Sequence, residues 1–377
     1  SIEDVLMPTN AVGVFDSRQR PDAISYPRPL FGRFGKWLGA EEAQVDYFQP
    51  ISYQLVRLRN DGQNSIHVVV SSVNRDSKTG EPVSFLAPPD AINAGTDRSL
   101  AFVSLAGQST TDVPLPIYFN PPGAEGVRAP DFSGAGHYER AIEVKVWGSD
   151  ATVLRMKRPL CIVTPNLHAL FVTACASAGT ILGILFLLRF HQLFFSHFST
   201  RQLILIALFG TTIFIAVSVP STLLSNLVSA LLGPIAFLIT GLINEMLYYA
   251  LLTSLLMLIP KPGVITLVSA VRLLLGGVTL GLFNPMALVY TSVSILLLEV
   301  GFQVTRKGSS LLLLALAFGV CDALAVYVDF QLSMTLYRLF YANWFIITRL
   351  LVDGFSYTFI GVLLGKRLGR GLWQVAE

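Results

Sequence analysis

The chain changes character near Thr164, where a polar, turn-rich segment gives way to a series of long apolar segments. The first of these runs from Pro165 to Leu188 without a full charge, and it is long enough to cross about 30 Å of hydrocarbon. Several similar segments follow with short connections between them. The pattern predicts an integral membrane protein that carries one water-soluble domain.

Seven membrane-spanning helices are expected after the soluble part. Their predicted ranges are 165–188, 202–219, 228–259, 263–281, 284–304, 310–330 and 341–365. The third range is too long for one upright helix. We therefore expect it to tilt, or to break near Gly233-Pro234 or Gly241.

The soluble part has the pattern of a β domain. Short segments rich in β-branched residues predict strands at 66–72, 83–87, 100–105 and 141–148. In the last segment, Ile142, Val144 and Val146 alternate with Glu143 and Lys145, as in a strand with one buried face. Turn-rich pieces separate the strands, so we expect a sandwich or jelly-roll whose first forty residues are irregular.

These patterns divide the chain into four parts. They are an external β domain (1–163), an anchor helix (164–189), a six-helix bundle (202–370) and a short cytoplasmic tail (371–377). The expected fold class is therefore an all-β domain followed by an all-α bundle of seven transmembrane helices. Because Ser1 is not preceded by an apolar segment, we expect export to have used a removed signal peptide or an omitted N-terminal segment.

Basic residues are concentrated in alternate connections between the predicted spans. One set of connections holds Arg189, Arg201, Lys261, Arg306, Lys307, Lys366, Arg367 and Arg370. The other set holds no basic residue at 220–227 or 282–283, and only Arg338 at 331–340. The positive-inside rule then places the C-terminus in the cytoplasm and residues 1–163 outside, as in the inner membrane of a prokaryote.

Composition and motifs exclude several classes of function. Residues 1–163 hold 16 basic and 18 acidic residues and the remainder holds 11 and 6, so neither part resembles a nucleic-acid binder. Cys161, Cys175 and Cys321 are scattered, which indicates packing residues and neither disulfides nor a metal site. The sequence contains no GxSxG, HExxH or paired-aspartate protease motif, so we expect neither an enzyme nor a bound cofactor.

Charged residues inside the predicted spans are the main candidates for a functional site, because each is costly when it faces lipid. They are Glu245, Arg272, Glu299, Asp322, Arg349 and Asp353. We expect them to point into the bundle, either as ion pairs between helices or as ligand-binding groups. Arg349 and Asp353 are four residues apart, which also fits a purely structural pair, and Glu299 lies where it can snorkel to the cytoplasmic surface.

Aromatic residues extend this candidate site. Tyr248 lies three residues after Glu245 on the same helical face, and Trp344 enters the last span from the outside. Aromatic residues at that level commonly form an interfacial belt, and the alternative is a stacking wall for a flat ligand. The predicted ligand-binding set is Glu245, Arg272, Asp322, Arg349, Asp353, Tyr248 and Trp344.

A sequence pattern in the bundle resembles a known family. A long apolar span carries Glu245, a turn Pro260-Lys261-Pro262-Gly263 follows, and the next span ends in Gly276-Gly277. A further span closes on Glu299 and Gly301. In these features residues 202–370 resemble the substrate-binding (S) components of energy-coupling factor transporters, with the closest likeness to the thiamine-precursor type.

The resemblance implies a bundle that binds a small molecule from the outer side and releases it inward. Because the sequence has no GxxxxGK[ST], ATP would be hydrolysed by separate cytoplasmic ATPase subunits that act through a coupling transmembrane subunit. Ala174 and Ala178 form an AxxxA pair that would contact this partner or the chain's own bundle. The external domain departs from the family pattern, and we expect it to gate the site or recruit an extracytoplasmic protein.

Two alternatives remain open at this point. An exported β domain before seven spans is also the layout of seven-helix receptors with a sensor domain. The sequence contains no kinase or cyclase module, so such a receptor would signal through a partner. The second alternative is a structural or assembly subunit of an envelope membrane complex, whose bundle has lost transport.

Overall fold

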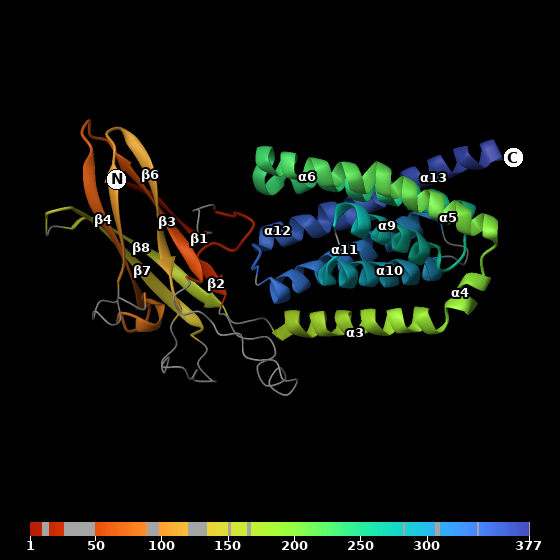
Figure 1. The fold of residues 1–377 in the computed structure, drawn as a ribbon, viewed down its shortest axis with the longest axis horizontal. Coiled ribbons are helices and arrows are strands. Elements are labelled where there is room, and N and C mark those ends of the chain that lie inside the picture. Colours follow the sequence, from red (N-terminus) through yellow and green to blue (C-terminus); the bar gives the residue numbers. More distant parts are fainter. Residues whose placement is uncertain are drawn as a thin grey trace. The chain divides into compact units, whose positions relative to one another are not determined.

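The computed structural model describes most of the chain as two compact units. The described residues are 1–9, 15–25, 50–88, 98–119, 134–149, 152–163, 167–281, 283–305, 310–337 and 339–376. Unit 1 comprises Ser1–Pro165 and Arg338–Ala342, and unit 2 comprises Asn166–Tyr337 and Asn343–Glu377. Unit 1 is built from strands and unit 2 from helices, which confirms the predicted fold class (Figure 1).

Unit 1 contains a three-stranded and a five-stranded sheet. The strands are β1 (Ile2–Thr9), β2 (Ala23–Ser25), β3 (Ser52–Asn60), β4 (Ile66–Asp76), β5 (Arg98–Leu105), β6 (Ser109–Ile117), β7 (Gly136–Val146) and β8 (Thr152–Val163). The sheet orders are β1-β3-β6 and β2-β8-β7-β4-β5, and the pairing of β2 with β8 is parallel while the other pairings are antiparallel. Val56 and Leu115 from the smaller sheet share one hydrophobic core with Val70 and Ile142 from the larger one. The two sheets therefore pack face to face.

Three of the four predicted strands are present, and one is wrong. Strands β4 and β5 cover their predicted segments and β7 covers 141–146 of the third, where Ile142 and Val144 are buried while Glu143 is not. The segment predicted as a strand at 83–87 instead contains a 3-10 helix, η1 (Ser84–Leu86). A short apolar run of this kind does not distinguish between the two structures.

The prediction of an irregular N-terminus is wrong for two segments. Residues 2–9 form β1, in which Val5, Met7 and Thr9 alternate into the core, and residues 23–25 form β2. Glu3, Asp4 and Pro8 obscure this alternation in the sequence. Residues 15–22 consist of turns and isolated bridges, as expected for an irregular segment, and the rest of the first forty residues lies outside the described residues.

A buried arginine joins β2 to the rest of its sheet. Arg140 on β7 is fully buried and donates hydrogen bonds to Asp22 just before β2, to Gln54 Oε1 at 3.2 Å and to Pro159 O at 3.0 Å. Burial lowers the pKa of Arg140 to about 10, and the charge and hydrogen bond of Asp22 oppose this shift. Arg140 is therefore still protonated near neutral pH, and its buried charge depends on Asp22 for a carboxylate partner.

Unit 2 is a bundle of apolar helices with several breaks and irregular turns. Its α-helices are α3 (Leu167–Arg189), α4 (His191–Ser196), α5 (Thr200–Ile213), α6 (Val219–Leu232), α7 (Phe237–Gly241), α8 (Leu247–Leu258), α9 (Val264–Leu280), α10 (Pro285–Thr305), α11 (Leu311–Leu336), α12 (Asn343–Thr348) and α13 (Thr358–Ala376). A 3-10 turn, η3 (Gly233–Ile235), follows α6. Three π-helical segments, η2 (Phe214–Ser218), η4 (Leu242–Met246) and η5 (Arg349–Tyr357), continue the helices that flank them.

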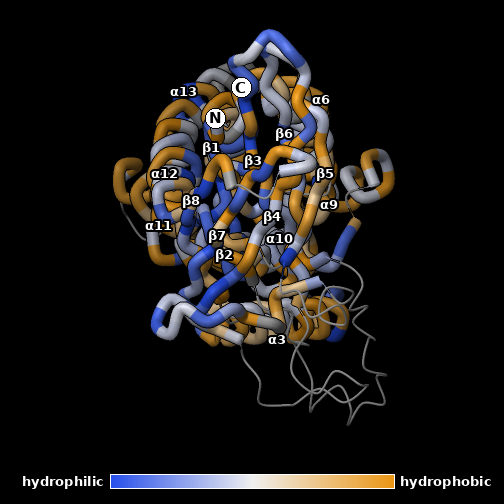
Figure 2. Tube along the Cα trace, turned by 90° about the vertical axis from the view of Figure 1, so that its left-hand side faces the viewer, coloured by the Kyte–Doolittle hydropathy of each residue, from blue (hydrophilic) through white to orange (hydrophobic). Residues whose placement is uncertain are grey.

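Within the described ranges, six helical stretches are long and apolar enough to cross a membrane. They are Leu167–Arg189, Thr200–Ser225, Phe237–Leu258, Pro285–Thr305, Leu311–Leu336 and Asn343–Gly371, and the shorter apolar helix Val264–Leu280 corresponds to the fourth predicted span. Figure 2 shows the hydrophobic character of these helices against the mixed pattern of the strands. The chain is therefore a multi-pass membrane protein.

The predicted connection at 220–227 is wrong, because these residues are helical. The π-helical segment η2 leads into α6, whose first turn contains Pro220. A proline inside a helix removes one backbone donor and crowds the preceding turn, and an irregular turn accommodates it. The break falls instead at Gly233, whose φ of 57° is favourable for glycine, which confirms one of the two expected positions.

Glycines spaced four residues apart bring α13 against α8. Gly361, Gly365 and Gly369 face α8, and a Cβ atom added at Gly365 would lie 2.5 Å from Ala250 O. The hydroxyl of Ser254 on α8 also donates to Gly365 O at 3.0 Å. Small residues at this spacing allow two backbones to approach closely inside a membrane.

We predict that Gly365→Ala lowers the thermal unfolding temperature of the full chain in detergent. The added methyl group overpacks the contact between α8 and α13, at a cost of about 1–3 kcal/mol. Gly371→Ala is the matched control, since no atom lies within 4 Å of a Cβ added there. Equal unfolding temperatures for the two variants would contradict this account of the packing.

We predict that Asp22→Asn loosens the attachment of β2 to β8 by about 2 kcal/mol, because the buried guanidinium of Arg140 loses its carboxylate partner. Hydrogen exchange of β2 and β8 in the full chain, followed by mass spectrometry, measures this loss. Arg140 stays protonated below a pKa of about 10, so the effect should be the same between about pH 6 and pH 8. Asp61→Asn, which removes an exposed partner of Arg59, should change little.

Candidate functional site

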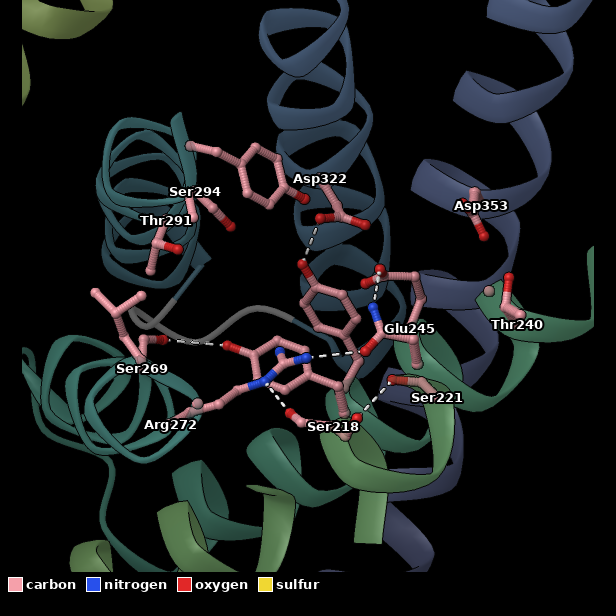
Figure 3. A pocket seen from close by; sticks show the side chains of 18 of the residues that line it. Ser218, Ser221, Thr240, Glu245, Ser269, Arg272, Thr291, Ser294, Asp322 and Asp353 are labelled. Carbon is pink, nitrogen blue, oxygen red and sulfur yellow. Dashed lines mark hydrogen bonds between the residues drawn. The ribbon is translucent and has the colours of Figure 1, made fainter. Parts of the chain in front are cut away.

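A polar cavity of about 540 Å³ lies inside unit 2 (Figure 3). Its volume is in the range of roughly 300–1,000 Å³ that is typical of small-molecule pockets. Its lining comes from η2, α6, α7, η4, α8, α9, α10, α11 and η5. The charged residues of the lining are Glu245, Arg272, Asp322, Arg349 and Asp353.

All three π-helical segments contribute side chains to this cavity. Ser218 comes from η2, Asn244 and Glu245 come from η4, and Arg349 and Asp353 come from η5. π-helical turns are rare and are frequently found at functional sites. Their concentration around one cavity supports its assignment as the functional site of the bundle.

Arg272 on α9 forms one pole of the site. Its Nε donates to Ser218 Oγ at 2.8 Å, one terminal nitrogen donates to Asn244 Oδ1 at 2.8 Å, and its guanidinium lies 4.7 Å from the centre of the Tyr248 ring. Within the described part of the chain, Arg272 forms no ion pair with a carboxylate. Its positive charge is held by neutral acceptors and an aromatic face.

Glu245 is connected to this arginine through a neutral amide. Asn244 Nδ2 donates to Glu245 Oε1 at 2.7 Å, while Asn244 Oδ1 accepts from Arg272. The second oxygen of Glu245 has no hydrogen-bond partner among the described residues. In Figure 3 the side chain of Glu245 extends toward the part of the cavity where Asp322 lies.

Asp322 on α11 is fully hydrogen-bonded. Tyr249 on α8 donates to its Oδ1 at 2.6 Å, and Thr358 at the start of α13 donates to its Oδ2 at 2.7 Å. Only 2% of Asp322 is exposed, so these two donors replace its hydration. The carboxylate thereby connects three helices at the wall of the cavity.

Arg349 and Asp353 form an ion pair along η5, with Arg349 Nε at 3.0 Å from Asp353 Oδ2. The Arg349 guanidinium also lies 5.6 Å from the centre of the Phe237 ring. The carboxylate of Asp353 occupies the space where a side chain at Gly241 would begin, so this position requires glycine. Asp353 Oδ1 has no hydrogen-bond partner in the described structure.

Hydroxyl groups complete the lining, and Tyr248 is the one among them that the predicted ligand-binding set includes. They belong to Ser218, Ser221, Thr222, Ser225, Thr240, Tyr248, Tyr249, Ser269, Tyr290, Thr291 and Ser294. On α6 and its preceding turn the first four recur at helical spacing, and Thr291 and Ser294 do so on α10. Such stripes of hydroxyl residues along otherwise apolar helices are the sequence pattern that could have identified these lining residues.

Six of the seven predicted ligand-binding residues line this cavity: Glu245, Arg272, Asp322, Arg349, Asp353 and Tyr248. Their role in binding stays a prediction. Trp344 is not part of the lining; it is 48% exposed and packs edge-on against Phe345. Phe345, four residues before Arg349, is the buried aromatic residue of this turn and packs against Phe237 and Phe330.

Glu299 lies outside the cavity and caps a helix. Its Oε1 accepts from the backbone of Gly263 at 3.0 Å, and from the backbone and hydroxyl of Thr266 at 3.2 Å and 3.1 Å. A carboxylate at a helix N-terminus satisfies free backbone donors and interacts favourably with the helix dipole. The structure thus shows a capping residue where snorkelling to the surface was expected.

The predicted partner-coupling pair lies on the exposed side of α3. Ala174 and Ala178 are exposed, whereas Ala169, Thr173 and Ala176 are buried against the bundle. Thr173 Oγ1 donates to Thr335 Oγ1 on α11 at 3.1 Å. The AxxxA pair therefore does not contact the chain's own bundle.

Comparison with known proteins gives little further identification. No protein-family model matches the chain, and no curated protein matches it. Among solved structures, the chain is similar to one described as the crystal structure of an S-component of ECF transporter. The identity is 22%, the TM-score is 0.39, and the match covers 48% of this chain and 87% of that chain. A similarity at this TM-score does not establish fold or function.

We predict that Asp353→Asn lowers the stability of the bundle by about 1.5–3 kcal/mol, because Arg349 loses its charged partner inside the helices. Thermal unfolding in detergent measures the loss. A double variant, Arg349→Gln with Asp353→Asn, should recover most of it, since neither charge is then left alone. A single variant as stable as the wild type would show that the pair does not stabilise the fold.

Proposed function

We propose that unit 2 binds a small polar molecule in its cavity, and that the chain is the substrate-binding subunit of a multi-subunit, ATP-driven transporter. The observation that carries this proposal is the incompletely paired set of charges around the cavity of about 540 Å³. Arg272 has no carboxylate partner among the described residues, and Glu245 has one oxygen without a partner. Groups of this kind are costly inside a membrane protein unless a ligand engages them.

The sequence pattern of residues 202–370 supports the transporter class. Its resemblance to S components of energy-coupling factor transporters rests on the span with Glu245, the Pro260–Gly263 turn and the glycine pair Gly276-Gly277. The cavity lies among the helices that carry this pattern. The sequence has no ATP-binding P-loop motif, so the proposal requires separate ATPase subunits and a coupling membrane subunit.

The distribution of basic residues supports an orientation with the β unit outside a prokaryotic inner membrane. Arg189 lies at the end of α3, Arg201 at the start of α5, Lys261 between α8 and α9, and Lys366, Arg367 and Arg370 in the second half of α13. In the sequence, Arg306 and Lys307 directly follow the last residue of α10. The turn at 233–236 contains none. The positive-inside rule assigns the basic ends to the cytoplasm, so the ligand would enter from the opposite side.

The exposed face of α3 is the proposed contact with the coupling subunit. Ala174 and Ala178 present a small-residue pair that the chain's own bundle leaves uncovered. Such a pair allows close approach of another helix within the membrane. The β unit would then recruit an extracytoplasmic protein or control access to the cavity.

The test is purification of the full chain in a mild detergent, followed by mass spectrometry under native conditions. We expect a bound small molecule, an ABC-type ATPase and a second membrane subunit. Arg272→Gln should lose the small molecule, while Arg201→Gln, which removes an exposed charge at the start of α5, should retain it. A kinase or a large envelope assembly without any ATPase would instead favour a receptor or a structural subunit.

A further inference from the structure

The charges of the cavity do not balance. Its described lining contains three carboxylates, from Glu245, Asp322 and Asp353, and two guanidinium groups, from Arg272 and Arg349. Asp353 is paired with Arg349. Of the remaining three, only Arg272 is positive, so the ionised lining carries one excess negative charge. An uncompensated charge inside a membrane bundle is strongly unfavourable, and a positive charge from outside the chain would remove this cost.

The carboxylates of Glu245 and Asp322 form a negative pole that is separate from the positive pole at Arg272. Arg272 is surrounded by Ser218, Asn244 and the Tyr248 ring, whereas Glu245 extends to the side where Asp322 lies (Figure 3). Asn244 stands between the two poles and hydrogen-bonds with both Arg272 and Glu245. A ligand that fills the cavity therefore meets a hydrogen-bond donor of positive charge at one end and carboxylates at the other.

The hydrogen bonds of Asp322 argue against a proton as the compensating charge on that residue. Each of its oxygens accepts from a hydroxyl donor, Tyr249 on one side and Thr358 on the other. Hydrogen bonds donated to both oxygens favour the ionised form of a carboxylate over its protonated form. Glu245, with one oxygen open to the cavity, is the carboxylate that a positively charged group can reach.

The arrangement of the carboxylates favours an organic cation over a metal ion. Among the described residues, no three His, Cys, Asp or Glu side chains are placed to hold one metal ion. The cavity instead offers the aromatic ring of Tyr290, whose hydroxyl has no hydrogen-bond partner within the described chain. Aromatic faces beside carboxylates are a common setting for ammonium and other organic cations.

We infer that the cavity takes a small organic cation that also carries a hydrogen-bond acceptor, with its positive group at Glu245 and Asp322 and its acceptor at Arg272. This inference rests on the proposed function and names the chemical class of its ligand. It requires that charge, and not shape alone, decides which molecules bind. Compounds that share a hydroxymethyl group and carry a positive, a negative or no charge therefore test it.

The test compares two series of compounds by thermal unfolding of the full chain in detergent at neutral pH. The aromatic series is 4-(hydroxymethyl)-N-methylpyridinium, 4-methylbenzyl alcohol and 4-(hydroxymethyl)benzoate. The aliphatic series is choline, 3,3-dimethylbutan-1-ol and 3-hydroxypropionate. Each compound is used at about 10 mM, so that even weak binding raises the unfolding temperature by mass action.

The cation of at least one series should stabilise the protein with an apparent affinity about tenfold or more above its neutral and anionic counterparts. Glu245→Gln should remove this preference, because the amide keeps an acceptor for Asn244 but loses the charge. Glu245→Asp, which keeps the charge, should retain the preference. Glu81→Gln, which removes an exposed charge from unit 1, is the matched control.

Stabilisation by a neutral or anionic member that equals or exceeds that of the cation overturns the inference but leaves the proposed binding unit standing. A cation preference that survives in Glu245→Gln also overturns it. If no compound of either series stabilises the protein, the result counts against the organic cation. If purification also yields no bound molecule, it counts against the proposed function as well.

Discussion

The cost of placing charge inside a membrane organises the helical unit. Five charged side chains from four segments of the bundle, η4, α9, α11 and η5, line one cavity. Four of them are compensated within the bundle: Arg349 pairs with Asp353, Asp322 accepts from two hydroxyl donors, and Arg272 contacts neutral acceptors and an aromatic ring. Glu245 accepts only one hydrogen bond, from Asn244. The cavity is the place where these interactions converge, so the bundle's architecture and its candidate site have one cause.

Close helix packing surrounds the irregular helical segments of the cavity. The stripe Gly361, Gly365 and Gly369 brings α13 against α8, and Asp322 ties α11 to both helices. The π-helical segment η4 continues directly into α8, and Gly361 packs against Met246 at its end, while η2 supplies Ser218 to the cavity. A π-turn is less stable than an α-turn, so it persists where the surrounding packing holds it.

The sequence was sufficient to predict which charged residues line the site. It was not sufficient to predict which aromatic residue of the last span faces inward, because that depends on the rotation of the helix about its axis. Glu245, Arg272 and Asp322 could be assigned to one interior because no other environment in a membrane suits them. Trp344 could not, because Phe345 and Arg349 share a helical face that Trp344 does not. The helix through Pro220 was missed for a related reason, since a residue that normally ends a helix is accommodated here by an irregular turn.

Asp322 and Glu245 differ in how completely the protein hydrogen-bonds their carboxylates. This difference decides which of the two carboxylates is able to bind a ligand. Each oxygen of Asp322 accepts a hydrogen bond, one from α8 and one from α13. Moving this side chain would therefore disturb the packing of α11 against both helices. Glu245 lies on the π-helical segment η4 and keeps one oxygen free among the described residues. Its neighbour Asn244 also holds Arg272, so a group that binds Glu245 acts on a segment already connected to the opposite pole. The two poles of the cavity are therefore mechanically linked through a single short segment.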